Sequence, residues 1–341
     1  MNGYERIAAA LHGEWPDKVP IMLHNFQMAA YESGITMDRF RRDPHAVAAA
    51  FIAAVERYGY DGVLVDVDTV TLAEAAGVPV DCPEHQPARA CGVRLKDLRR
   101  VRDLSPVDLS ASPRVQVWLE ATRLLKRHFG AEIFVRGNCD QSPFTLAALV
   151  RGIDDWMTDL LDPLAGEYIQ ALLDYCTGIT TQFLGLMATA GADMLSNGDS
   201  TAGPDLVSPA LYRRFAFPSE QRVVTAAHTH RLPYALHICG NTDLILEPML
   251  ATGADALELD YKTDAGRAHA LMHHRTAFIG NIDPSGVLAL GTPQEVAASV
   301  RALLRVFADT PRFILNAGCA LPPETPSANL QALIQTAREF R

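Results

Sequence analysis

Eight short apolar runs recur along the chain, and most of them lead into a longer stretch with helical periodicity. Strands that each pass through a helix to the next strand form a parallel sheet with right-handed crossovers, and eight of them close a (β/α)8 barrel. We therefore expect an α/β protein with the TIM-barrel architecture, and a doubly wound open sheet is the rival. The runs cover residues 20–24, 62–68, 132–138, 193–199, 234–240, 256–260, 277–281 and 312–318.

Three of the expected helices carry recognisable start signals. Asp43-Pro44, Ser208-Pro209 and Thr292-Pro293 each place a capping side chain before a proline at the first helical position. Glu295 follows Thr292 at the spacing of a capping box. These signals predict helices that begin at residues 44, 209 and 293.

Two segments exceed what a minimal barrel needs. The residues before the first run are expected to form an N-terminal helical extension. Residues 78–115 are rich in proline and arginine and show no clear periodicity, so we expect an excursion over one face, whose role the sequence does not reveal. Barrels of this length are commonly one unit, and residues 1–341 are therefore expected to form a single domain.

Composition narrows the classes of partner. The net charge of −10 gives no long-range attraction for nucleic-acid phosphates or anionic membranes, so neither is an expected partner. The N-terminal sequence lacks the pattern of a signal peptide, and no run of about twenty apolar residues could span a bilayer. Six cysteines are too few for a disulfide scaffold in a chain of 341 residues. The sequence predicts a cytoplasmic protein with reduced thiols.

Polar side chains gather at the ends of the expected strands, where barrels of this type build their active sites. Asp68 ends the second run and Asp199 ends the fourth, which makes these two carboxylates the candidate catalytic residues. Strand-end aspartates also cap helices and stabilise turns, so a structural role is the alternative for each. Other polar residues at or just after strand ends are His24, Asp66, Asn138, Asp140, Asn281 and Asp283.

His237-Ile-Cys239 and the later Cys319 form a group of potential metal ligands. His237 and Cys239 stand two positions apart, so an extended strand turns both side chains to the same face. One imidazole and two thiolates can hold zinc with one exchangeable position, as catalytic zinc sites do. Glu258 and Asp260 on the sixth run are possible fourth ligands. The alternative interpretation is that these are ordinary buried residues.

Several motifs together resemble the uroporphyrinogen decarboxylase superfamily over nearly the whole chain. They are Pro16 with Val19-Pro20, SPFTLAALVRG (142–152), AGADMLSNGDSTAG (190–203), SPALYRRF (208–215), GNIDPSGVL (280–288) with GTPQEV (291–296), and ILNAGCALPPETPSANL (314–330). Within the superfamily, the His-x-Cys pattern with a distant cysteine is similar to the zinc-dependent methyltransferase branch. Members of that branch move methyl groups from a corrinoid protein to a thiol such as coenzyme M.

The resemblance implies particular roles for residues of this chain. His237, Cys239 and Cys319 match the three zinc-ligand positions of the branch. Asp260 is the best match to an acidic residue that the branch often carries after the His-x-Cys, and Glu258 is the less favoured substitute. Asp68 occupies the position of the central aspartate with which the decarboxylases hold the pyrrole nitrogens.

The decarboxylase branch differs at the decisive places. Its members bind a tetrapyrrole with many carboxylates through an Arg-Gln-x-Gly-Arg stretch just after the first strand. Here that stretch reads His-Asn-Phe-Gln-Met (24–28), and the chain has no arginine between Arg6 and Arg39. The histidine that the decarboxylases carry near the C-terminus falls where this chain has Cys319. The resemblance therefore favours the methyltransferase branch, with tetrapyrrole decarboxylation as the alternative.

The implied activity is zinc-dependent transfer of a methyl group from a methylated corrinoid to a thiol. Zinc would lower the pKa of the bound thiol, so that a thiolate forms at neutral pH without a separate strong base. The chain has no Asp-x-His-x-x-Gly cobalamin signature, so methylcobalamin is expected on a separate corrinoid protein or free in solution. Homocysteine or a folate is an alternative acceptor. A non-catalytic accessory protein that binds a corrinoid or a metal is the remaining alternative.

Overall fold

The computed structural model describes residues 1–340 and confirms the predicted (β/α)8 barrel. Eight parallel strands follow one another around the sheet in chain order. Ile21, just before the first strand, pairs with Leu315 on the last, and the Leu315 N–H donates to the Pro20 carbonyl at 2.9 Å, so the ring closes. The strands are β1 (Met22–Leu23), β2 (Gly62–Val65), β5 (Phe134–Gln141), β6 (Met194–Gly198), β7 (Tyr234–Ile238), β8 (Ala256–Leu259), β9 (Ala277–Ile282) and β10 (Phe313–Ala317).

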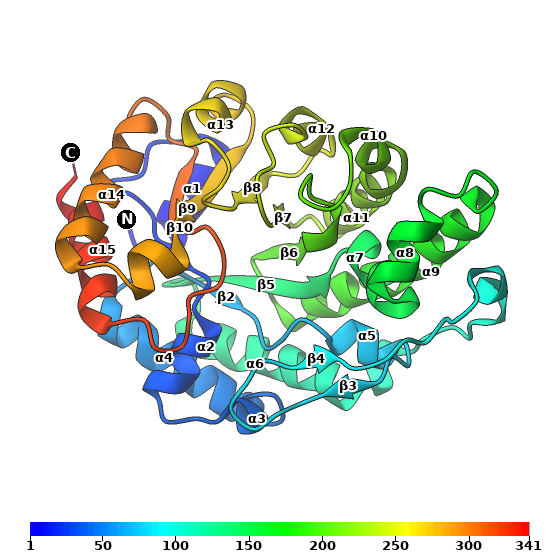
Figure 1. Ribbon diagram of the computed structural model, residues 1–341. Helices are drawn as coiled ribbons and strands as arrows, with labels where there is room; N and C mark the ends of the chain where they lie inside the picture. The colour runs from blue at the N-terminus through cyan, green and yellow to red at the C-terminus, as the bar shows by residue number, and fades with distance from the viewer. Residues whose placement is uncertain (341) are drawn as a thin grey trace.

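Helices surround the ring of strands and connect each strand to the next (Figure 1). The predicted helix starts are confirmed, because Asp43 caps α4, Ser208 caps α10, and Thr292 forms a capping box with Glu295 at the start of α14. The helices are α1 (Gly3–His12), α2 (Phe26–Glu32), α3 (Met37–Phe40), α4 (Pro44–Tyr58), α5 (Thr71–Ala75), α6 (Pro113–Phe129), α7 (Pro143–Arg151), α8 (Ile153–Asp159), α9 (Gly166–Ala190), α10 (Pro209–Leu211), α11 (Phe217–Thr229), α12 (Leu246–Ala251), α13 (Ala265–Met272), α14 (Pro293–Val306) and α15 (Ser327–Glu339).

Helix α1 is the predicted N-terminal extension, and it packs against the end of the barrel where the strands begin. Its apolar side chains Ile7, Ala10 and Leu11 are buried in one cluster with residues near the strand starts. Those residues are Met22, Phe134, Met194, Ala235, Ala256, Ala277, Ile279 and Ile314. Because this end of the barrel is filled with apolar side chains, the opposite end, where the strands finish, is the one available for chemistry.

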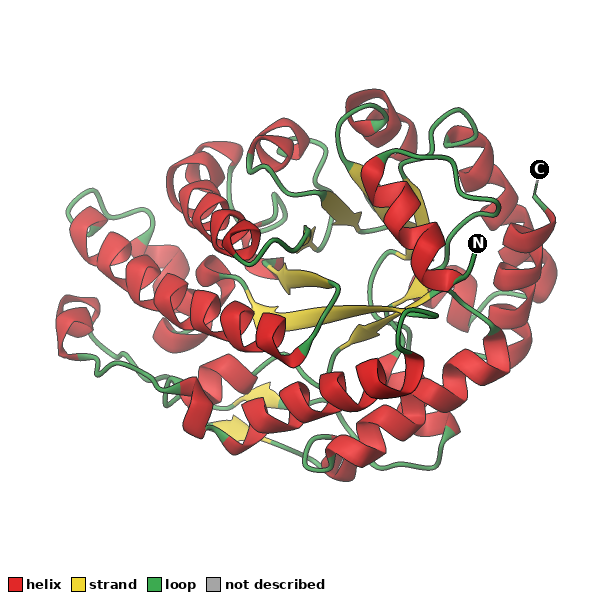
Figure 2. Cartoon of the chain, turned by 180° about the vertical axis from the view of Figure 1, so that it is seen from behind, coloured by secondary structure: helices red, strands yellow, loops and turns green. Residues whose placement is uncertain are grey.

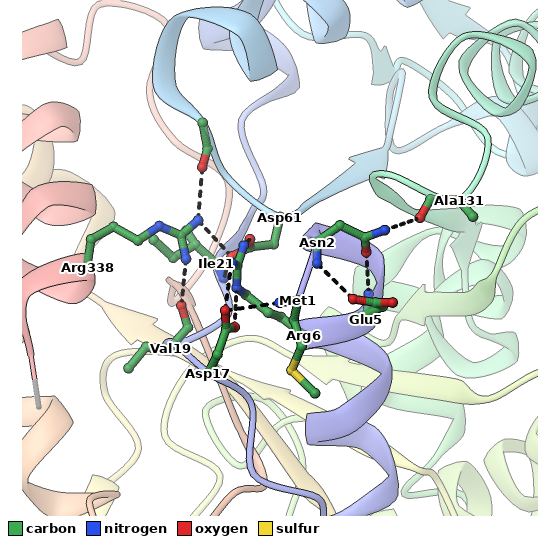
Figure 3. Close-up of polar contacts among 11 residues, drawn as sticks. Met1, Asn2, Glu5, Arg6, Asp17, Val19, Ile21, Asp61, Ala131 and Arg338 are labelled. Atoms are coloured by element: carbon green, nitrogen blue, oxygen red, sulfur yellow. Dashed lines mark hydrogen bonds and ion pairs between the residues drawn. The ribbon is translucent and has the colours of Figure 1, made fainter.

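A buried carboxylate ties both ends of the chain to this closed end of the barrel (Figure 3). Asp61, which precedes β2, accepts hydrogen bonds from Arg6 on α1 at 3.0 Å and from the Ile21 N–H at 2.8 Å. Arg338 on α15 forms an ion pair at 2.9 Å with Asp61 Oδ2, the same oxygen that accepts from Ile21. Helices from the two ends of the chain are thereby joined through one side chain.

We expect Asp61→Asn to lower the free energy of unfolding by about 2 kcal/mol, because two arginines lose a buried counter-charge. The loss stays below that of a fully buried pair, since Arg6 and Arg338 keep 16% and 19% of their side chains exposed. Urea-induced unfolding measures the change. Asp17→Asn is the matched control, because Asp17 also pairs with Arg6 but is 41% exposed, and it should cost less than about 1 kcal/mol. Equal losses in both variants would contradict the assignment.

The segment between α5 and α6 follows the edge of the barrel beside α6 (Figures 1 and 2). It contains an antiparallel hairpin of β3 (Val80–Asp81) and β4 (Arg89–Ala90), followed by the short 3-10 helices η1 (Leu98–Asp103) and η2 (Leu109–Ala111). It leads into the first turn of α6, from which Arg114 forms an ion pair with Asp68. Within residues 1–340, no helix is long and apolar enough to cross a membrane.

Candidate metal centre

The three side chains expected to bind zinc meet where the strands finish. His237 lies on β7, Cys239 follows that strand directly, and Cys319 lies in the loop after β10. His237 Nε2 lies 3.1 Å from Cys239 Sγ, and the two sulfurs are 4.0 Å apart. All three ligand atoms lie within 4.8 Å of one another, and they form the one such group of three or more potential ligands in residues 1–340.

A glycine beside each cysteine shapes the loop that carries it. Gly240, which follows Cys239, has a φ of 85°, in the left-handed region that favours glycine. Gly318 precedes Cys319, and a Cβ at Gly318 would lie 2.4 Å from the backbone nitrogen of Tyr261. The β10 loop therefore packs against the segment after β8 at a distance that only glycine allows, and this contact places Cys319 opposite Cys239.

Two neighbours orient the ligand atoms. The Nδ1–H of His237 donates to the Glu258 carbonyl on β8 at 2.9 Å, and this bond turns Nε2 toward the cysteines. The Ser200 hydroxyl lies 3.2 Å from Cys239 Sγ. A histidine whose second nitrogen donates to a backbone carbonyl has the tautomer and the ring position that metal ligation requires.

The short distances between the three ligand atoms, together with their burial, shift the pKa values of all three residues. The hydrogen bond from Cys319 lowers the pKa of Cys239 to about 3 against the opposing effect of burial, and His237 contributes to the lowering. The same hydrogen bond, together with burial, raises the pKa of Cys319 well above its usual value. Burial alone would lower the pKa of His237, but the Cys239 sulfur outweighs it and raises that pKa to about 10. At neutral pH the cluster without a metal thus carries one thiolate and two protonated ligands.

The donor set and its spacing fit zinc. Two sulfurs and one imidazole nitrogen are ligands that zinc prefers, and bond lengths of about 2.3 Å to sulfur and 2.0 Å to nitrogen separate tetrahedral ligands by roughly 3.5–3.8 Å. The observed separations of 4.0 Å and 3.1 Å bracket that range, so small side-chain shifts suffice. A tetrahedral zinc held by these three residues would keep a fourth position for an exogenous ligand.

Both acidic candidates for that fourth position have other partners. The two oxygens of Asp260 accept hydrogen bonds from the Gly240 N–H at 2.9 Å and the Lys262 N–H at 3.0 Å, so this carboxylate organises the two loops beside the cluster. Glu258 binds Arg136 and Asn316. The structure brings neither carboxylate into the three-ligand group. Zinc ligation by Asp260 therefore stays a prediction, which this hydrogen bonding does not favour.

A pocket of about 140 Å³ opens directly onto the cluster. Its walls include the three ligands together with His24, Asp66, Arg136, Asp140 and Glu258. Several of these polar side chains are almost completely buried, and burial raises the pKa of Asp140 well above its usual value. A small polar pocket beside an open coordination position is suited to a small ligand with a metal-binding group and hydrogen-bonding atoms.

The two candidate catalytic aspartates lie outside the lining of this pocket. Asp68 accepts from the Val70 N–H at 2.9 Å and forms an ion pair with Arg114. Asp199 is completely buried, and one of its oxygens accepts both the N–H and the hydroxyl of Thr145 at 2.7 Å. This geometry favours positioning roles, and contact with a substrate stays a prediction for both residues.

A buried ion pair crosses the barrel interior and forms part of the pocket wall, and the sequence analysis missed its arginine. Arg136 on β5 and Glu258 on β8 are each only 2% exposed and bind each other. Asn316 on β10 donates to the second Glu258 oxygen at 2.7 Å. The one available signal was an arginine directly after the apolar residues Phe134 and Val135 of an expected strand, because a charge at such a position requires a buried partner.

Comparison with known proteins identifies the family to which the chain belongs. The sequence profile described as uroporphyrinogen decarboxylase (URO-D) matches residues 2–340. The chain belongs to the uroporphyrinogen decarboxylase family. Similar family members include the methylcobamide:CoM methyltransferase MtbA of Methanosarcina mazei, which is 29% identical, with 99% of this chain and 98% of that protein covered. The corresponding MtaA of Methanosarcina barkeri is 26% identical, with 98% and 97% covered.

The uroporphyrinogen decarboxylase of an Azoarcus strain is also 29% identical, but the match covers only 87% of this chain and 83% of that protein. A methyltransferase structure from Methanosarcina mazei covers 100% of this chain and 99% of its own with a TM-score of 0.86 and 24% sequence identity, which shows the shared fold. The family resemblance predicted from the motifs is therefore confirmed.

Proposed function

We propose that this protein is a zinc-dependent methyltransferase that moves a methyl group from a methylated corrinoid to a small thiol. The observation that carries the proposal is the open three-ligand cluster of His237, Cys239 and Cys319 at the mouth of the barrel. The near full-length similarity to methylcobamide:CoM methyltransferases supports it, since those relatives carry the activity in their names.

Different residues would bind the zinc, orient its ligands and orient the incoming thiol. His237, Cys239 and Cys319 would hold the zinc, which supplies the positive charge that lowers the pKa of an incoming thiol. The hydrogen bond from His237 to the Glu258 carbonyl keeps the imidazole aligned, and Ser200 stabilises the Cys239 thiolate. The pocket beside the cluster would orient the thiol so that its sulfur faces the barrel mouth.

The size of the pocket favours a small acceptor. Pockets for drug-sized ligands measure roughly 300–1,000 Å³, and this one measures about 140 Å³. A short thiol matches that volume better than a folate or a tetrapyrrole does. The ion pair between Asp68 and Arg114 also occupies the carboxylate expected to hold pyrrole nitrogens, which disfavours decarboxylation further.

We infer that the corrinoid arrives on a separate protein that docks at the barrel mouth. Residues 1–340 form the barrel and its attached helices, and the sequence carries no cobalamin-binding signature. Methyl transfer requires the cobalt-bound methyl group to reach the sulfur in line, so the donor must approach the end of the barrel where the cluster opens.

Zinc affinity should rise steeply with pH. Both His237 and Cys319 hold protons at neutral pH without a metal, because their pKa values are raised, and the ion must displace both. The apparent association constant should therefore increase by up to about 100-fold per pH unit between pH 6 and 8, one factor of ten for each proton. Competition with a chromophoric chelator measures this slope. An affinity independent of pH would contradict ligation by these two residues.

Metal removal and restoration test the proposed function. The chelator-treated protein should lose thiol-dependent demethylation of methylcobalamin, and added zinc should restore it. A tetrapyrrole decarboxylase of this family would keep its activity in chelator, because that reaction needs no metal. Stoichiometric zinc without any demethylation would instead favour the non-catalytic accessory role.

A further inference from the structure

A histidine and an aspartate form a buried pair on the wall of the pocket. His24 follows β1 and Asp66 follows β2, and His24 Nε2 lies 2.7 Å from Asp66 Oδ2. Only 13% of the His24 side chain and 2% of the Asp66 side chain are exposed. Both residues line the pocket that contains Cys239 and Cys319.

The pair leaves one basic atom free. A carboxylate only accepts hydrogen bonds, so Nε2 of His24 carries the proton and Nδ1 holds a lone pair. Within residues 1–340, His24 Nδ1 is buried without a hydrogen-bond partner. An imidazole that one carboxylate orients, with its second nitrogen unpartnered, is the arrangement of a general base.

The backbone holds His24 close to the loop that carries Cys319. The His24 N–H donates to Asn316 Oδ1 at 3.0 Å, and the His24 carbonyl accepts from the Leu321 N–H at 2.8 Å. Asn316 and Leu321 lie on either side of Cys319 in the sequence. The free nitrogen of the pair and the metal ligands therefore share one small pocket through adjoining segments of chain.

We propose that His24 is the catalytic base that accepts the proton of the incoming thiol, with Asp66 as its positioning residue. The inference rests on the proposed function and deepens it. The S–H bond breaks, its electron pair stays on sulfur, and the proton moves to Nδ1 of His24. The imidazolium formed is stabilised by the Asp66 carboxylate and returns its proton to water after the methyl group has been transferred.

A base remains useful although the metal lowers the pKa of the thiol. A free thiol has a pKa of about 8.5, so it arrives protonated at neutral pH and its proton must leave a small pocket. A weak base suffices, which agrees with the expectation that no strong base is needed. Asp140 is a poorer candidate, because the Leu72 N–H already occupies one of its oxygens at 2.7 Å.

Proton counting by titration calorimetry tests this inference apart from turnover. The zinc-loaded protein is titrated with coenzyme M, mercaptoethanol and homocysteine at neutral pH in buffers of different ionisation enthalpy. Wild-type protein should release close to no proton for each thiol bound, because His24 keeps it. His24→Gln should release about one proton, since glutamine can still donate to Asp66 but has no basic atom. Thiol-dependent demethylation should fall about 100-fold in this variant.

The chain offers a matched control. His269 on α13 forms a similar pair with Asp309 at 2.7 Å on the outer surface, and His269→Gln should behave as wild type. Asp66→Asn is a second variant, and it should also release most of the proton, with zinc content and melting temperature as checks of folding. Normal thiol binding with equal proton release in wild type and His24→Gln would overturn the inference alone. No binding of any of the three thiols to zinc-loaded wild type would overturn the proposed function, and this inference with it.

Discussion

Replacing either Cys239 or Cys319 by serine is expected to remove bound zinc and thiol-dependent methyl transfer together. Each variant leaves two of the three ligands, and a serine hydroxyl is a poor zinc ligand because it stays protonated at neutral pH. We expect zinc content to fall from near one per chain to a small fraction, and demethylation of methylcobalamin to fall at least about 1,000-fold, since metal and thiolate are lost at once. Elemental analysis and the loss of methyl-cobalt absorbance measure the two effects.

Cys91→Ser is the matched control for these variants, because Cys91 is exposed and lies outside the cluster. It should keep full zinc content and full activity. A Cys239→Ser or Cys319→Ser protein that retains one zinc per chain would show that the metal binds elsewhere. Such a result would remove the observation on which the proposed function depends.

Breaking the ion pair between Arg136 and Glu258 should have the largest effect on stability. Glu258→Gln keeps the shape of the side chain but leaves the Arg136 charge uncompensated in the barrel interior, where only 2% of it is exposed. Loss of one partner of a buried pair costs about 3–5 kcal/mol of unfolding free energy. Urea-induced unfolding of the zinc-free protein measures the change without a contribution from the metal.

An exposed pair provides the comparison. Asp174 and Arg222 form an ion pair with 51% of each side chain exposed, so Asp174→Asn should change the unfolding free energy by less than about 1 kcal/mol. If Glu258→Gln cost no more than Asp174→Asn, the charge of Arg136 would not depend on Glu258, and the buried pair would lose its assigned role.

The barrel and the grouping of His237, Cys239 and Cys319 could be predicted because their signals are local. Each strand is a short apolar run, and the His-x-Cys spacing places two ligands on one face of a strand. Cys319 follows Gly318 after the last strand. Closure of the barrel brings the ends of β7 and β10 to the same end of the barrel, so Cys319 was expected to lie near the other two residues.

The interior of the site could not be predicted in the same way, because its partners lie far apart in sequence. Arg136 meets Glu258 across 122 positions, and nothing near either residue indicates the other. Asp68 is paired with Arg114, which lies in a segment without periodicity. The sequence therefore offered no indication that this ion pair forms. Asp260 faces backbone N–H groups of two loops, and a carboxylate that organises loops has the same sequence pattern as a ligand.

The most direct test of the central claim is to identify the product. Zinc-loaded protein is incubated with methylcobalamin carrying an isotopically labelled methyl group and with coenzyme M, and the thiol fraction is analysed by mass spectrometry. We predict one labelled methyl group on the sulfur of coenzyme M for each cobalamin demethylated, with no labelled product from the Cys319→Ser protein. Unchanged methylcobalamin together with unmodified coenzyme M, mercaptoethanol and homocysteine, in the presence of stoichiometric zinc, would contradict the account.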